Sequence, residues 1–131
     1  MTASALVVDD DSLFLRLLEL NLGKAGLKVL LAESGNEALR LARDNNPDII
    51  LLDLMMPAMD GFEVMRLLKA SEKTRDIPVV MLTAKSSQAD RQRCEEMGAV
   101  DYVTKPFNLE KLRSMVSRIV GFSPGSRASS E

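Results

Sequence analysis

The sequence contains no histidine and no tryptophan among its 131 residues, and its only cysteine is Cys94. Without histidine the chain has no Ser-His-Asp triad, no histidine-based metal site and no phosphohistidine of its own. A single cysteine excludes an internal disulfide and a cysteine-based zinc site. Any chemistry in this chain therefore depends on carboxylates, lysine and hydroxyl groups.

Long apolar runs and a strong net charge are also absent. No run approaches the roughly 20 apolar residues of a membrane span, and no basic region precedes the short apolar run at the N-terminus. The formal net charge is −2, which disfavours direct nucleic-acid binding. We therefore expect no signal peptide and neither a membrane nor a nucleic acid among the partners.

The length of 131 residues suits one compact domain. A domain of this size buries roughly two thirds of its unfolded surface, so it needs no metal or disulfide to fold. We expect this domain to cover residues 1–120. Residues 121–131 are rich in Gly, Pro and Ser, a composition that predicts a flexible tail or the beginning of a linker.

Short apolar runs alternate with amphipathic stretches five times along the chain. The runs predict strands, and the stretches predict helices because their apolar residues recur at helical spacing. Five strand–helix units in a row predict an α/β fold with a parallel sheet and helices on both faces. The predicted strands cover residues 5–8, 27–32, 48–52, 78–82 and 99–103, and the predicted helices cover residues 13–22 and 88–97 and follow caps at Ser34, Asp60 and Asn108.

Charged residues in the strands indicate the strand order. The first, third and fourth strands are almost wholly apolar, as burial on both faces requires. The second and fifth contain Lys28 and Asp101, which fit the edges of a sheet better. A doubly wound sheet of order 2-1-3-4-5, the flavodoxin-like topology, places these two strands at the edges and ligands beyond the carboxyl ends of the strands.

Polar residues follow the predicted strands where ligands are expected. Asp9 and Asp10 follow the first strand, and Asp53, Thr83 and Lys105 end or follow the third, fourth and fifth. Each has an ordinary explanation alone, because aspartate and threonine commonly form turns and caps and lysine is commonly solvated. At one edge of one sheet, however, all five predict a single polar pocket.

The composition of this pocket predicts its chemistry. Three carboxylates repel one another unless they bind protons or a cation. Oxygen ligands predict a hard divalent cation, Mg²⁺ before Ca²⁺. Mg²⁺ takes few protein ligands and prefers phosphate oxygens, so one carboxylate remains able to attack phosphorus and form an acyl phosphate. Lys105 would neutralise charge on the transferred group.

Four motifs stand at the ends of the predicted strands: Val7-Val8-Asp9-Asp10-Asp11, Asp53-Leu54-Met55-Met56-Pro57 with Asp60-Gly61, Leu82-Thr83-Ala84 and Lys105-Pro106-Phe107. In order and spacing they resemble the receiver domain of two-component response regulators of the chemotaxis type. The resemblance covers about residues 5–120. It implies a cytoplasmic phosphoprotein that accepts a phosphoryl group in a phosphorelay and is not an enzyme in the ordinary sense.

The resemblance also implies a role for each pocket residue. Asp53 is the phosphoacceptor. Asp10, Asp53 and the Met55 carbonyl bind Mg²⁺ directly, with Mn²⁺ as the alternative ion, and Asp9 acts mainly through water. Lys105 contacts the phosphoryl group. The donor is a phosphohistidine on a histidine kinase or a histidine phosphotransfer protein, since this chain has no histidine.

A switch follows from the same resemblance. Thr83 moves to hydrogen-bond the phosphoryl group, and Tyr102 is the rotating aromatic of the output face, although an aromatic on an edge strand also packs with no further role. The moving part is residues 84–98, whose helix has the fewest apolar residues and so the least burial to hold it. The signal then leaves through residues 84–120 to an output domain or a target protein.

Two positions near the pocket are expected to set the lifetime of the acyl phosphate. Met55, two residues after Asp53, cannot orient an attacking water, so we expect slow self-dephosphorylation; otherwise it only packs over the pocket. Lys85, two residues after Thr83, places a second cation near the pocket mouth. In the family these two positions tune the lifetime.

The expected oligomeric state is a monomer or a phosphorylation-dependent dimer. A charge-paired dimer of the winged-helix regulator type calls for an acidic residue near position 111 and a basic one near 115, where Lys111 and Met115 stand. An apolar contact through Met97, Val100 and Met115 is the other prediction, unless one or two of these belong to the core.

The residues disfavour three other functions. A phosphohydrolase of the haloacid-dehalogenase type needs a second aspartate two residues after Asp53, where Met55 stands. A flavin-binding domain of this fold needs a phosphate-binding loop after the first strand, where three aspartates stand instead. A receiver that never accepts phosphate is disfavoured because all five pocket residues are present.

Overall fold

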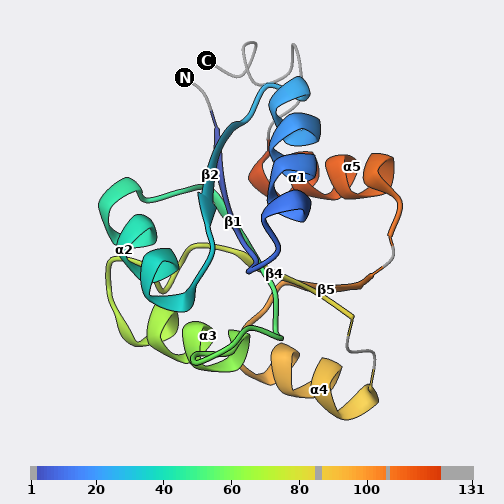
Figure 1. Ribbon diagram of the computed structural model, residues 1–131. Helices are drawn as coiled ribbons and strands as arrows, with labels where there is room; N and C mark the ends of the chain where they lie inside the picture. The colour runs from blue at the N-terminus through green and yellow to red at the C-terminus, as the bar shows by residue number, and fades with distance from the viewer. Residues whose placement is uncertain (1–2, 85–86, 106, 122–131) are drawn as a thin grey trace.

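The computed structural model describes residues 3–84, 87–105 and 107–121. Within these ranges five strands alternate with five helices (Figure 1). The strands are β1 (Ser4–Val8), β2 (Lys28–Ala32), β3 (Ile49–Leu52), β4 (Val79–Thr83) and β5 (Asp101–Thr104). The helices are α1 (Ser12–Lys24), α2 (Gly35–Asn45), α3 (Gly61–Ala70), α4 (Gln88–Glu96) and α5 (Leu109–Val120).

All strands of the sheet run parallel, in the order β2-β1-β3-β4-β5. This confirms the predicted doubly wound α/β fold and its strand order. The three central strands are buried, whereas β2 begins with exposed Lys28 and β5 begins with half-buried Asp101. A charged side chain reaches water only at a sheet edge, so these two residues predicted the order correctly.

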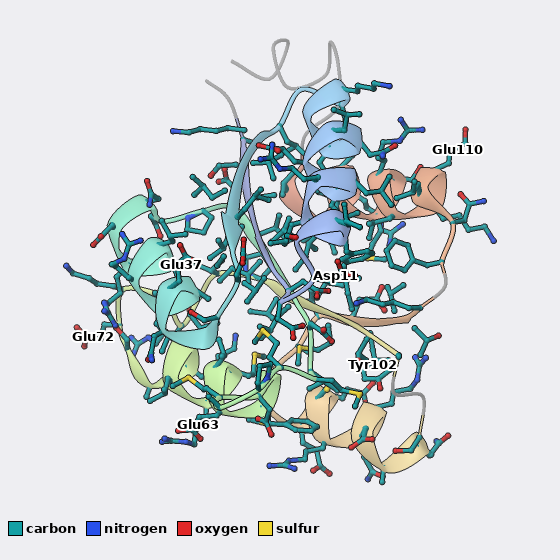
Figure 2. The ribbon with its side chains drawn as sticks, in the orientation of Figure 1. Asp11, Glu37, Glu63, Glu72, Tyr102 and Glu110 are labelled. Atoms are coloured by element: carbon teal, nitrogen blue, oxygen red, sulfur yellow. The ribbon has the colours of Figure 1, made fainter. Side chains whose placement is uncertain are left out.

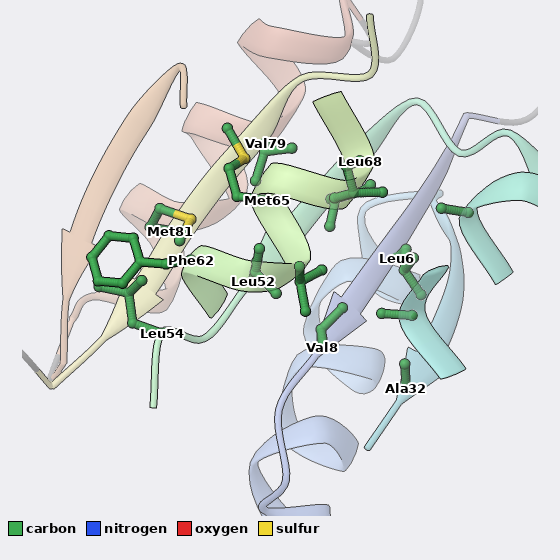
Figure 3. Close-up of a cluster of buried hydrophobic side chains, with 14 of the residues drawn as sticks. Leu6, Val8, Ala32, Leu52, Leu54, Phe62, Met65, Leu68, Val79 and Met81 are labelled. Carbon is green, nitrogen blue, oxygen red and sulfur yellow. The ribbon is translucent and has the colours of Figure 1, made fainter. Parts of the chain in front are cut away.

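The helices cover the two faces of the sheet unequally. In Figure 1, α1 and α5 lie on one face, and α2, α3 and α4 lie on the other. Successive side chains of each strand alternate between these faces. Leu6 and Val8 of β1 belong to the cluster beneath α2 and α3 (Figure 3), whereas Ala5 and Val7 belong to the cluster beneath α1 and α5. The sheet therefore separates two apolar cores.

Side-chain caps begin the helices at the predicted places. The Ser34 hydroxyl accepts from the Glu37 amide at 3.2 Å, and the Glu37 carboxylate accepts from the Glu33 amide at 2.8 Å. Asp60 and Asn108 cap α3 and α5, each accepting from the third following amide at 3.0 Å. These bonds satisfy amides that have no partner inside the helix.

Element boundaries differ from the predicted ones by a few residues. The first helix extends from Ser12 to Lys24, beyond the predicted end at residue 22, because Gly23 is accommodated in its last turn. Strand β5 begins at Asp101 rather than at residue 99, since Gly98 turns the chain with a φ of 102°. Terminal turns of helices and strands are the least determined by apolar spacing.

Helix α4 has the weakest attachment to the core, as expected. Its one buried side chain among the described residues is Cys94, which burial keeps at a pKa of about 11. No helix in the described part of the chain is both long and apolar enough to cross a bilayer. Residues 122–131, the greater part of the predicted tail, lie outside the described residues.

Candidate metal centre

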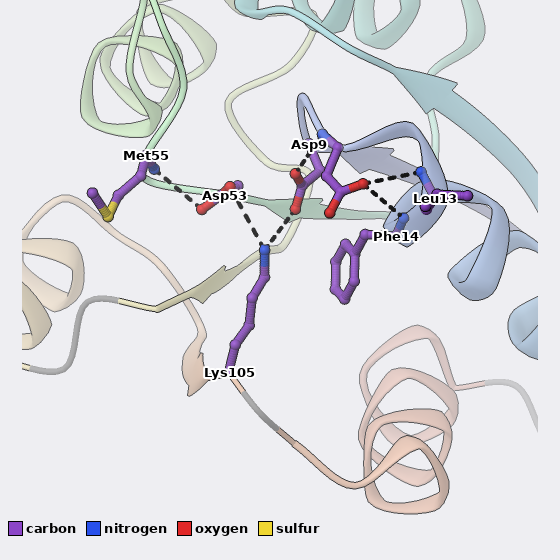
Figure 4. Close-up of polar contacts among 7 residues, drawn as sticks. Asp9, Leu13, Phe14, Asp53, Met55 and Lys105 are labelled. Atoms are coloured by element: carbon purple, nitrogen blue, oxygen red, sulfur yellow. Dashed lines mark hydrogen bonds and ion pairs between the residues drawn. The ribbon is translucent and has the colours of Figure 1, made fainter.

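Three carboxylates and one ammonium meet at the carboxyl ends of the strands (Figure 4). Asp9, Asp10 and Asp53 each offer a carboxylate oxygen, and these oxygens lie within 4.8 Å of one another. Asp9 and Asp53 are buried, with 2% and 5% of their surfaces exposed, whereas Asp10 is exposed. The sheet thus brings together Asp9 and Asp53, which lie 44 positions apart in the sequence.

Backbone hydrogen bonds position the two buried carboxylates. The Asp9 amide donates to Ala32 of β2 at 3.0 Å, and the Asp53 amide donates to Val8 of β1 at 3.1 Å. These bonds continue the parallel ladder one residue past each strand, so both side chains project from the same sheet edge. The polar edge is therefore a direct consequence of strand register.

Local turns orient the same two carboxylates. Asp9 Oδ1 accepts from the Asp11 amide at 2.9 Å, and Asp53 Oδ1 accepts from the Met55 amide at 3.1 Å. Aspartate commonly accepts from an amide two residues later, which fixes one of its oxygens. In each case Oδ2 faces the lysine, as described below.

Gly61 closes the loop that follows Asp53. Its amide donates to the Leu54 carbonyl at 2.9 Å. A Cβ at this position would lie 2.5 Å from the Asp53 carbonyl oxygen and 2.7 Å from Leu54 Cα. Both obstacles are backbone atoms, which cannot move aside, so glycine lets α3 begin directly against the end of β3.

Lys105 brings the positive charge to the pocket. Its amide donates to the Thr83 carbonyl at 2.8 Å, which places it beside the end of β4. Its Nζ donates to Asp9 Oδ2 at 2.7 Å and lies 3.7 Å from Asp53 Oδ2. Thr83 is fully buried at the same edge. The structure thus brings all five predicted pocket residues to one edge of the sheet.

Burial raises the pKa of the Asp53 carboxyl above its ordinary value. The Met55 amide opposes this by donating to the ionised form, the Asp9 and Asp10 charges raise the pKa further, and Lys105 lowers it. Burial and like charge prevail because one ammonium faces three carboxylates. An all-oxygen donor set with excess negative charge fits a hard divalent cation.

Two predicted residues near the pocket have different surroundings. Met55 is 55% exposed, and its side chain extends away from Asp53 and Lys105 (Figure 4). Tyr102 lies away from the pocket between β5 and α4 (Figure 2), 7% exposed, with Arg91 Cζ 4.7 Å from the ring centroid. Its ring is buried in this structure, and its role as a switch residue stays a prediction. Lys85 and Pro106 lie outside the described residues.

Only one of the three residues of the predicted apolar contact surface is mostly exposed. Met97 and Met115 are half-buried and pack against the two cores. Val100 is 53% exposed. Met97 and Met115 are therefore partly buried at the margins of the cores, and an apolar contact between proteins through Val100 stays a prediction.

An exposed apolar stripe on α1 escaped the sequence analysis. Leu13, Leu17 and Leu20 are 80%, 46% and 63% exposed. The spacing of the leucines could have revealed this stripe, because the buried leucines of α1 occupy a different helical face. Leu13 lies in the first turn of α1, where its amide donates to the cap residue Asp11 at 3.0 Å (Figure 4), so the stripe begins at the end of α1 that follows the carboxyl end of β1. The buried leucines are Leu15, Leu18 and Leu22.

Two aromatic residues beside the lysine were also missed as site residues. The Lys105 Nζ lies 4.2 Å from the centroid of the Phe14 ring. Phe14 and Phe107 make an edge-to-face pair with centroids 5.8 Å apart and planes at 85°. No spacing signal reveals this arrangement, because Phe14 lies on α1 and Phe107 follows β5.

Comparison with known proteins gives one consistent family. The family model for the response regulator receiver domain matches residues 5–117. The chemotaxis protein CheY4 of Vibrio cholerae superposes with a TM-score of 0.86 at 33% identity, over 91% of this chain and 99% of that chain. The Francisella response regulator 1452 receiver domain gives 0.85 at 31% identity, over 92% and 98%.

A third solved structure bears on the metal. The receiver domain of sensor histidine kinase PA1611 from Pseudomonas aeruginosa PAO1 superposes with a TM-score of 0.84 at 33% identity. The match covers 93% of this chain and 100% of that chain, and that structure has a magnesium ion coordinated in the active site cleft.

Proposed function

We propose a phosphorelay function from the premise that this chain belongs to the response regulator receiver domain family of two-component signalling. Asp53 accepts a phosphoryl group from a phosphohistidine of a partner protein in a Mg²⁺-dependent reaction. The observation that carries this proposal is the meeting of Asp9, Asp10 and Asp53 with Lys105 at the carboxyl edge of the sheet.

The proposed chemistry is a single displacement at phosphorus. A carboxylate oxygen of Asp53 forms the new O–P bond as the N–P bond of the phosphohistidine breaks, and the departing imidazole takes up a proton. Asp53 suits this role because the Met55 amide holds Oδ1 while Oδ2 makes only a 3.7 Å contact with Lys105. Positioning and charge neutralisation supply most of the catalysis in phosphoryl transfer.

The carboxylates fit the ion that this reaction requires. Asp10, Asp53 and the Met55 carbonyl would hold Mg²⁺, or Mn²⁺ in its place, and Asp9 would act through water. The bound ion supplies positive charge to the phosphoryl oxygens. The all-oxygen donor set and the excess negative charge support this assignment.

Lys105 and Thr83 complete the proposed phosphoryl site. The Lys105 ammonium is anchored by Asp9 and lies one ångström closer to Asp9 than to Asp53, at 2.7 Å against 3.7 Å. The ammonium therefore lies beside the phosphoacceptor, where it can donate a hydrogen bond to the phosphoryl oxygens. Thr83 turns its hydroxyl to the same group.

The proposed output is a movement of α4 and β5. A phosphoryl group adds about −1.5 to −2 charges and three acceptor oxygens at the end of β3. Thr83 and Tyr102 respond, and α4 shifts because Cys94 is its one buried side chain in the described chain. The signal leaves through residues 84–120 to an output domain or a target protein, with the protein a monomer or a phosphorylation-dependent dimer.

The α1 stripe supports docking of the phosphohistidine partner. Because this chain has no histidine, the donor is a partner protein that must reach Asp53, and the stripe begins with exposed Leu13 in the first turn of α1, soon after Asp9 and Asp10. Leu17 and Leu20 continue the apolar surface along α1.

We further propose that the domain covers residues 1–120, acts in the cytoplasm, binds no nucleic acid directly and is a phosphoacceptor rather than an enzyme.

An intact-mass measurement tests the proposed function. The protein is incubated with acetyl phosphate and Mg²⁺, and one added phosphoryl group is expected. The added mass should be absent in Asp53→Ala and after EDTA treatment, and unchanged in Asp44→Ala, an exposed aspartate of α2. Consumption of many equivalents of donor per minute would instead support a phosphohydrolase, and no uptake at all would overturn the proposal.

A further inference from the structure

The Lys105 ammonium lies between carboxylates and an aromatic ring. Its Nζ is 2.7 Å from Asp9 Oδ2 and 4.2 Å from the centroid of the Phe14 ring (Figure 4). A cation within about 6 Å of a ring centroid is attracted by the negative ring face. The lysine side chain is only 24% exposed, so water screens this attraction incompletely.

Phe14 is itself held from two directions. Its amide donates to Asp11 Oδ1, the cap of α1, at 3.3 Å. Its ring packs edge-to-face on Phe107, with centroids 5.8 Å apart. Phe107 lies two residues after Lys105, so α1 contacts both the ammonium and the backbone segment that carries it. The ring therefore has little freedom to leave the lysine.

The Phe14 ring limits the conformations that the Lys105 side chain can take. The ammonium is a compact charge on a flexible four-carbon stem, and it has several rotamers of similar energy. The Asp9 hydrogen bond anchors the ammonium at one point but leaves the stem able to take more than one rotamer. A ring on the remaining side restricts the ammonium to the place between Asp9 and Asp53.

We propose that Phe14 is a positioning residue for Lys105, whose ring face holds the ammonium beside Asp53, and that Phe107 keeps the ring in place. This inference rests on the proposed function, because a held ammonium matters to phosphoryl transfer through Lys105. The Phe14 ring contacts the Lys105 ammonium and the Phe107 ring, so we assign it an action through the lysine.

The first test needs no phosphorylation. Protons beside a ring face are shielded, so the Lys105 side-chain resonances, assigned with Lys105→Arg, should lie upfield of the other lysines. Phe14→Leu should return them to ordinary positions, and Phe14→Trp should keep them shielded. Phe62→Leu is the matched control, since it removes a ring that faces Arg93 at 3.9 Å and should leave Lys105 unchanged.

The second test measures phosphoryl uptake from acetyl phosphate at saturating Mg²⁺. Loss of a cation–π contact predicts a rate about two- to fivefold lower in Phe14→Leu, with recovery in Phe14→Trp. Unshifted Lys105 resonances, or an unchanged rate in a folded Phe14→Leu, would overturn the inference. If the wild-type protein takes up no phosphoryl group, the proposed function fails, while the resonance test still decides whether the ring holds the lysine.

Discussion

Lys105 donates a 2.7 Å hydrogen bond to Asp9, although its ammonium also faces Asp53 at 3.7 Å. The shorter contact compensates the charge of Asp9, whose Oδ1 also accepts a hydrogen bond from the Asp11 amide. Asp53 keeps the less compensated charge, in a buried position. Removing the Asp53 charge, or binding a cation beside it, should therefore stabilise the fold.

Asp53→Asn should raise the free energy of unfolding of the metal-free protein at neutral pH. Burial raises the pKa of Asp53 in the folded state, so the folded state binds its proton more tightly than the unfolded state does. The ionised carboxylate therefore destabilises the fold above its raised pKa, and protonation relieves this as the pH falls toward the ordinary value. Urea unfolding across pH 4–7 measures the difference. Asp44→Asn is the exposed control, and equal stability of Asp53→Asn and wild type at neutral pH would contradict the argument.

Mg²⁺ should stabilise the wild-type protein at neutral pH. A ligand that binds only the folded state at tenfold its Kd adds about 1.4 kcal/mol to the free energy of unfolding. Asp53→Asn removes one of the three clustered carboxylates and should lose most of this gain. Thermal melts with and without Mg²⁺ measure it, and an undiminished gain in Asp53→Asn would place the ion elsewhere.

Met55→Asn should shorten the lifetime of the phosphorylated protein. Met55 is 55% exposed, and its side chain has no group that can orient a water. An amide there can hydrogen-bond the attacking water, and positioned groups of this kind speed proton-coupled steps at least several-fold. Decay of the phosphoprotein is followed by mass after removal of the donor. Met55→Leu should decay as slowly as wild type, and a decay of Met55→Asn equal to or slower than wild type would show that Met55 only packs.

Arg93→Ala and Arg91→Ala should loosen α4. Arg93 Cζ lies 3.9 Å from the Phe62 centroid, and Arg91 Cζ lies 4.7 Å from that of Tyr102. Each exposed contact of this kind contributes about 0.5–1 kcal/mol, which corresponds to about two- to fivefold faster amide exchange in α4. Hydrogen exchange measures this by peptide. Arg40→Ala on α2 is the control, and unchanged exchange of α4 in both variants would mean that the arginines do not hold it.

Gly61→Ala should destabilise the protein by about 2 kcal/mol or more, because its Cβ would collide with backbone atoms of β3. Gly23→Ala should have the opposite effect. Beyond the backbone of its own helix and its chain neighbours, no atom lies within 4 Å of a Cβ at that position, and alanine is favoured over glycine in helices by about 1 kcal/mol. Chemical unfolding compares the two variants, and destabilisation by both would indicate that the close contact at Gly61 is not the cause.

The sequence was sufficient to predict the fold because its signals agree. Apolar runs gave the strands, and Lys28 and Asp101 placed two of them at the edges. The meeting of Asp9 and Asp53 followed from topology alone, since parallel strands bring their carboxyl ends to one side. These predictions needed only the spacing of the apolar residues and the positions of the charged residues, and both can be read directly from the sequence.

The rest depended on packing that spacing does not encode. The position of the Phe14 ring over Lys105 joins the first helix to the segment after the last strand, on the face that α1 and α5 share. The inward ring of Tyr102 and the partial burial of Met97 depend on how α4 rests against β5. Such relationships arise from side-chain contacts between elements, and no pattern within one element reveals them.

The ion pair between Asp9 and Lys105 also has a consequence for biosynthesis. The two residues are 96 positions apart, so a ribosome adding about 5–20 residues per second needs roughly 5–20 s to supply the lysine after the aspartate. During that interval Asp9 and Asp53 emerge with no cationic partner of their own. The acidic pocket is therefore completed only when the last strand has joined the sheet, and the nascent chain reaches its final charge balance late.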